Sequence, residues 1–185
     1  MNKNLFLRTF GFFAVVVVIL SRISAAAQFT HPTLGYSFSY PDQWFCKTTS
    51  VEKSGASGPV LSTVRDIVQN IPEGAAIVFV QTFPPFDINF REGTDEYSKL
   101  REMALAESHD PNIRNVRHVD GTGGVRFTET WEAGTFTKLW LARRREGRLF
   151  VFMLEYYAND PKGASYERDL DAIVSSIAVS PTPHR

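Results

Sequence analysis

The fold is decided by residues 125–157, which read VRFTETWEAGTFTKLWLARRREGRLFVFMLEYY. Three runs rich in β-branched and aromatic residues, at 125–132, 135–144 and 149–157, are separated by two short breaks that each contain a glycine. This pattern predicts three antiparallel strands joined by two hairpins. The last run is apolar at consecutive positions, so we expect that strand to be covered on both faces of the sheet.

Further strands are predicted on the N-terminal side of this meander. Tyr36, Phe38 and Tyr40 alternate with serines, and Pro41 ends the run, as in a half-buried strand. Residues 60–71 fit both a helical stripe and a short strand followed by a loop, and the second interpretation is preferred. Additional strands are expected at 44–49, 75–83 and 113–119.

Two helices are predicted between and after the strands. Thr94 can cap a helix whose first turn carries Asp95 and Glu96, because negative charge is favourable at a helix N-terminus. A second helix starts near 160–165 and has the clearest amphipathic stripe, formed by Tyr166, Leu170, Ile173, Val174 and Ile177. These elements predict an α+β fold, a mainly antiparallel β-sheet covered by helices on both faces as an α/β/α sandwich.

The first 27 residues have the pattern of a secretory signal peptide. Lys3 and Arg8 precede an apolar run at 10–20, and Ala25-Ala26-Ala27 offers a small-x-small cleavage site. The run is about half of the roughly 20 residues needed to cross a bilayer, so we expect no stable membrane anchor. We expect cleavage after Ala27 and a secreted or periplasmic protein, with a single globular domain at 28–180 and a disordered C-terminal tail at 181–185.

Composition narrows the function classes. The first 27 residues hold three of the 20 basic residues and none of the 20 acidic ones, so the remainder carries 17 against 20 and a formal charge of −3. This mild acidity gives no general attraction to nucleic acid. Cys46 is the only cysteine and is expected to be a small buried hydrophobic residue. The four histidines lack the spacing of metal ligands, so we expect no metal and no cofactor.

One constellation in the meander offers possible chemistry. If the strands turn at Ala133-Gly134 and Glu146-Gly147 with two-residue loops, Glu129 faces Lys138, which in turn faces Glu155. An apolar row of Phe127, Trp140 and Met153 would lie beside them. A lysine between two carboxylates next to an aromatic wall is a setting in which pKa values shift and acid-base catalysis can operate.

The competing interpretation is a structural row of cross-strand ion pairs, each stabilising by roughly 0.2 to 1 kcal/mol. A three-residue first loop would place Glu129 opposite Thr137 instead. The acid-base hypothesis therefore requires Glu129 and Lys138 to occupy facing positions.

A second candidate is the arginine-rich tip of the second hairpin. Guanidinium groups are planar donors that can hold a phosphate or a partner's carboxylates, and a solvated turn is the alternative. The tip contains Arg143, Arg144, Arg145 and Arg148.

The two ends of the chain carry a family resemblance. The segment Gly35–Pro41, followed by Trp44, together with the amphipathic stretch 171–177, resembles the PsbP-like group, which includes Ran-binding Mog-type proteins and many exported bacterial proteins. The resemblance spans about residues 29–179 in element order. It implies a sheet sandwiched between helices.

The resemblance implies a binding function. PsbP is an extrinsic, non-catalytic subunit of the oxygen-evolving complex, and the Mog-type proteins bind a small GTPase, but no contact residue of either is matched here. We therefore expect an exported, monomeric, non-catalytic accessory or binding domain that acts on an unknown protein or envelope partner. The alternative is a hydrolase-like acid-base enzyme that uses Glu129, Lys138 and Glu155.

Overall fold

The computed structural model describes residues 26–48, 58–66, 71–83, 95–107, 113–119 and 124–180. Residues 1–25 of the predicted signal peptide (1–27) and the predicted tail at 181–185 lie outside this range. The last two residues of the predicted signal peptide, Ala26 and Ala27, begin the first strand. No helix in the described ranges is long and apolar enough to cross a membrane.

Ten strands and two helices form the described structure. In chain order they are β1 (Ala26–Thr30), β2 (Tyr36–Pro41), β3 (Phe45–Thr48), β4 (Pro59–Ser62), β5 (Ala76–Phe83), α1 (Glu96–Glu107), β6 (Arg114–Val119), β7 (Gly124–Trp131), β8 (Gly134–Arg145), β9 (Arg148–Tyr157), α2 (Gly163–Ser175) and β10 (Ala178–Val179). The three-strand meander and both helices are confirmed. The ambiguous segment 60–71 begins as a strand, as preferred, and β1 and β10 were not predicted.

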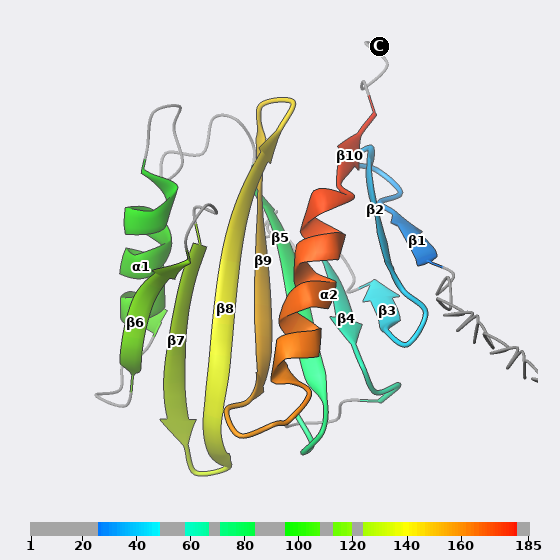
Figure 1. Ribbon diagram of the computed structural model, residues 1–185. Helices are drawn as coiled ribbons and strands as arrows, with labels where there is room; N and C mark the ends of the chain where they lie inside the picture. The colour runs from blue at the N-terminus through cyan, green and yellow to red at the C-terminus, as the bar shows by residue number, and fades with distance from the viewer. Residues whose placement is uncertain are drawn as a thin grey trace, which may run out of the picture.

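Seven strands build one antiparallel sheet in the order β3-β4-β5-β9-β8-β7-β6. A smaller antiparallel sheet, β1-β2-β10, joins the two ends of the described chain (Figure 1). The long strands β8 and β9 occupy the middle of the large sheet, because their apolar residues on both faces require cover on both sides.

One face of the large sheet, which we call the covered face, packs against α2 and the small sheet. Strand residues that include Leu141 and Phe152 meet Leu170 of α2 and Phe38 of β2 in the largest core cluster. Figure 1 shows α2 lying across this face over β8, β9 and β5. Each large side chain sealed here contributes roughly 1.5–3 kcal/mol through apolar burial.

The opposite face, which we call the open face, is covered differently. Leu100 of α1 packs with Phe127, Trp140 and Val151 at the end of the sheet formed by β7 and β8. On β5, further along the same face, Phe79 is 39% exposed. The sheet is therefore mainly antiparallel as predicted. Among the described residues, helical cover of this second face is seen over β7 and β8, and cover of the whole face by helices is not shown.

Candidate functional site

The open face brings together the three predicted acid-base residues. Lys138 Nζ lies 2.6 Å from Glu129 Oε2 and 3.4 Å from Glu155 Oε2. The three side chains are largely buried, with 8% of Glu129, 15% of Lys138 and 24% of Glu155 exposed. A lysine between two carboxylates is thus present, with Glu155 the more distant and the more exposed of the two.

The predicted register of the first hairpin is wrong by two residues. The loop is Glu132-Ala133, so Glu129 pairs with Phe136 and Lys138 pairs with Phe127. Glu129 reaches Lys138 along the diagonal, which is possible because a shift of two residues keeps every side chain on the same face. The second hairpin has the predicted register, with Lys138 directly opposite Glu155.

Burial and neighbouring charges shift the pKa values of two residues in this ion-pair row, Lys138 and Glu155. Burial acts to lower the pKa of Lys138, but attraction from Glu155 and Glu129 outweighs it and the pKa is raised. Burial raises the pKa of the Glu155 carboxyl, and Lys138 only partly offsets this effect. Lys138 therefore stays protonated near neutral pH and cannot serve as a base. Since Glu129 and Lys138 are not on facing positions, the requirement of the acid-base hypothesis is not met.

Aromatic side chains surround the ion-pair row. Lys138 Nζ lies 5.3 Å from the ring centre of Trp131, a cation–π distance, and Trp131 is 57% exposed. The predicted apolar row is present, with the rings of Phe127 and Trp140 5.4 Å apart. A shallow pocket of about 180 Å³ opens beside the row and is lined by Phe79, Gln81, Lys138, Trp140, Met153, Leu154 and Glu155.

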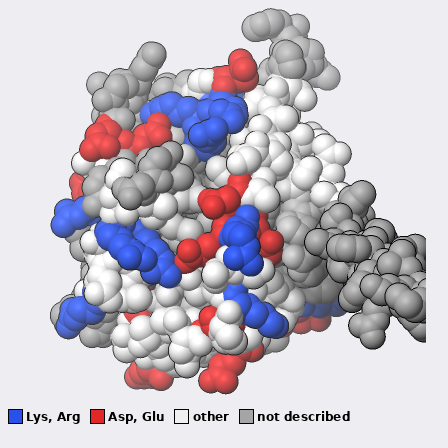
Figure 2. Space-filling model, in the orientation of Figure 1, with Lys and Arg blue, Asp and Glu red and all other residues white. Residues whose placement is uncertain are grey.

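The four predicted tip arginines do not form one group. Arg144 Nε bonds Glu96 Oε1 of α1 at 2.6 Å on the open face. The other three belong to the opposite side of the hairpin, and Arg148 donates to the Leu34 carbonyl. Figure 2 shows basic side chains gathered at the upper end of the molecule, where the β8–β9 hairpin lies in Figure 1.

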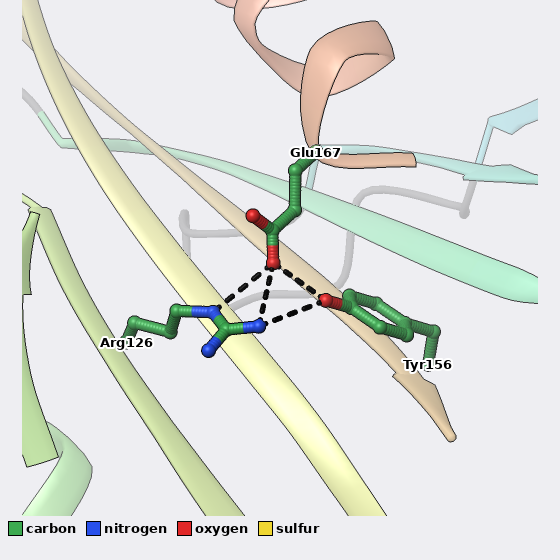
Figure 3. Close-up of polar contacts among 3 residues, drawn as sticks. All are labelled: Arg126, Tyr156 and Glu167. Carbon is green, nitrogen blue, oxygen red and sulfur yellow. Dashed lines mark hydrogen bonds and ion pairs between the residues drawn. The ribbon is translucent and has the colours of Figure 1, made fainter. Parts of the chain in front are cut away.

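A third polar cluster was not predicted from the sequence. Arg126 donates to Glu167 Oε1 through Nε at 3.0 Å and through Nη2 at 2.9 Å, and Tyr156 donates to the same oxygen at 2.5 Å (Figure 3). These contacts tie α2 to β7 and β9. All donors converge on one carboxylate oxygen, so the cluster fastens the helix to the sheet.

The thiol of Cys46 is a poor nucleophile in this arrangement. Burial raises the pKa of the Cys46 thiol to about 11, so the thiolate needed for nucleophilic attack is scarce at neutral pH. Among the described residues, no group of three or more histidine, cysteine, aspartate or glutamate side chains could hold a metal ion.

Comparison with known proteins identifies the fold. No family model and no curated protein matches the sequence. The solution structure of cyanobacterial PsbP (CyanoP) from Synechocystis sp. PCC 6803 is similar, with a TM-score of 0.50 and 18% identity over 85% of this chain and 94% of that one. The crystal structure of the Ran-binding protein Mog1p from Saccharomyces cerevisiae gives a TM-score of 0.52 and 11% identity over 84% and 96%. The chain therefore has the PsbP/Mog-like fold.

Proposed function

We propose that this chain is an exported, non-catalytic binding domain that docks on a protein partner through the open face of its large sheet. The observation that carries the proposal is the pair of exposed aromatic side chains, Trp131 and Phe79, on the face that bears the Glu129–Lys138–Glu155 row. Aromatic residues of this size are enriched at the centres of protein interfaces.

The open face is suited to recognition because apolar and charged groups alternate across it. Phe79 and Met153 supply apolar contact area beside Glu155, whose carboxylate shares Lys138 with Glu129. Two carboxylates against one ammonium leave a net negative charge. A partner that places a lysine or arginine near Glu155 and apolar side chains over Phe79 would complement the surface in both respects.

The state of Lys138 supports a non-catalytic role for the described ion-pair row. Lys138 is fixed as a cation, and both carboxylates bond it. CyanoP and the Ran-binding protein Mog1p share the fold, and the name of the latter records a binding function. Nucleic acid is a poor partner, because the chain has no excess of basic residues.

Export is supported by the sequence alone. The basic start, the apolar run and the alanines at 25–27 form the pattern read by the secretion machinery. Mass spectrometry of the protein recovered from its native host should give a chain that begins at Gln28. A chain that retains residues 1–27 in the membrane fraction would overturn this part of the proposal.

Site-specific photo-cross-linking tests the docking face. A photoreactive phenylalanine analogue at position 79 or 131 should join the protein to one defined partner in the host's envelope fraction. The matched control is the same analogue at position 168, where Arg168 of α2 is exposed on the other side of the molecule. Equal cross-linking from position 168, or none from positions 79 and 131, would contradict the proposal.

A further inference from the structure

Three arginines share one side of the β8–β9 hairpin, away from the open face. Arg145 pairs directly with Arg148 across the hairpin, and Arg143 lies two residues before Arg145 on β8. Because side chains alternate along a strand, all three belong to the covered face, whereas Arg144 between them bonds Glu96 on the open face. Figure 2 shows the resulting gathering of basic side chains at the end of the molecule.

Two of these arginines, Arg145 and Arg148, occupy directly facing positions. Like charges directly opposite one another destabilise an antiparallel pair. In the part of the chain that the structure describes, no carboxylate forms an ion pair with Arg143, Arg145 or Arg148. The hairpin therefore places three arginines on one side of its two strands, and no ion pair among the described residues offsets their charge.

The hairpin presents these arginines on a rigid support. Glu146 and Gly147 have φ angles of 48° and 73°, the left-handed pair expected of a type I′ turn, whose twist matches that of the strands. Arg148 Nη1 donates to the Leu34 carbonyl, which fixes the direction of that side chain and joins the hairpin to the turn after β1. One guanidinium is thus oriented before any ligand arrives.

The positive field extends to the neighbouring histidine. His31 is buried beside this hairpin, and its pKa is lowered first by burial and then by the charge on Arg148. The predicted mature chain has a formal charge of −3, so its net charge does not attract anions. Affinity for an anion at this hairpin would therefore come from the arginines themselves.

We propose that Arg143, Arg145 and Arg148 form a binding site for a phosphate group. Guanidinium forks match the oxygens of a phosphate group, which can accept two parallel N–H bonds from one arginine. The phosphate group can belong to a soluble molecule or to the headgroup of an envelope lipid. The site lies on the opposite side of the sheet from the docking face and does not depend on it.

Two binding measurements test this site and distinguish the two sources. Backbone amide NMR shifts of residues 143–148 are followed during titration with inorganic phosphate. Flotation with vesicles of phosphatidylglycerol, against vesicles of phosphatidylcholine alone, measures lipid binding. We expect saturable amide shifts confined to the hairpin, saturable binding to the phosphatidylglycerol vesicles, or both. Response to phosphate only identifies a soluble ligand, and response to phosphatidylglycerol only identifies a headgroup.

Charge-matched variants make the test specific. Arg143→Gln with Arg145→Gln should weaken the binding of whichever probe responds. For vesicles the expected loss is about 30-fold, since each arginine near a membrane surface contributes a factor of about 5. The control, Arg101→Gln with Arg168→Gln, removes the same charge from exposed positions on the two helices and should keep the original affinity. Equal weakening in both double variants, or no binding of either probe by the unaltered protein, would overturn the site.

Discussion

The two faces of the large sheet are built from the same strands, but their side chains differ in how far they are buried. On the covered face, Phe152 and Leu170 are fully buried between the sheet and α2. On the open face, the apolar residues give way to an ion-pair row and to the exposed rings of Phe79 and Trp131. Strand alternation therefore lets one face supply much of the core while the other carries charged and exposed aromatic side chains.

The largest loss of stability is expected for a substitution on the covered face. Leu170→Ala should lower the free energy of unfolding by about 2–5 kcal/mol, because it leaves a cavity in a site that is 0% exposed. Urea or guanidinium denaturation followed by circular dichroism measures the change. A loss below about 0.5 kcal/mol, the range of ordinary surface substitutions, would show that α2 does not seal this face.

The next largest loss of stability is expected at Lys138, in the ion-pair row of the open face. Lys138→Ala should destabilise the protein by about 1–3 kcal/mol, because it leaves two largely buried carboxylates without their shared cation. The pKa of Glu155, already raised by burial, would rise further.

The pH dependence of that variant gives an independent check. A carboxyl whose pKa is higher in the folded than in the unfolded state binds more protons when folded, so stability increases as pH falls through the raised folded pKa toward the unfolded pKa. Denaturation of Lys138→Ala at a series of pH values should therefore show recovery on acidification relative to the unaltered protein. A parallel pH profile for the two proteins would contradict the role assigned to Lys138.

A much smaller effect on stability is expected at the exposed ring. Trp131→Ala should change the free energy of unfolding by no more than about 0.5 kcal/mol beyond the lost contact with Lys138. The same denaturation measurement applies, with Leu170→Ala as the contrasting variant. A loss as large as that of Leu170→Ala would mean that the open face is part of the core.

The smallest effect concerns a pH-sensitive turn beneath the covered face. His31 Nδ1 accepts hydrogen bonds from the Leu34 and Thr33 amides at 3.0 and 3.2 Å, which only the neutral ring can do. Because its pKa is lowered on folding, its contribution is present above pH 6.5 and is lost as pH falls below that value.

The substitution His31→Asn separates this contribution from the rest of the pH profile. An asparagine oxygen can accept the same two amide bonds but does not titrate. Thermal denaturation between pH 7 and 5 should show a shallower loss of stability in the variant. An unchanged slope would remove His31 as a source of acid sensitivity.

The sequence predicted correctly which face of the sheet the candidate site residues occupy. The apolar alternation of β7, β8 and β9 placed Glu129, Lys138 and Glu155 on one face, because pattern fixes the face of each side chain. It did not fix the first turn. Gly134 was taken for a turn residue, yet it lies in β8, where a side chain would come within 2.8 Å of the Tyr157 ring. A close approach and a turn both favour glycine, and the sequence alone does not distinguish them.

Contacts between layers were beyond sequence reasoning. Arg126 and Glu167 are 41 residues apart, and nothing in either segment indicates that α2 crosses β7 and β9 at this point. The strands β1 and β10 were missed for a related reason. Each is short and is defined by its pairing with β2 rather than by a pattern of its own.

The affinity of the cross-linked partner shows whether the open face binds a protein. Isothermal titration calorimetry compares the two sides of the molecule. It measures partner affinity for three proteins: the unaltered protein, the double variant Phe79→Ala/Trp131→Ala and the control Arg168→Gln. Two aromatic anchors at the centre of an interface predict a loss of about 100-fold or more in the double variant and none in the control. Equal affinity for all three proteins would contradict the account.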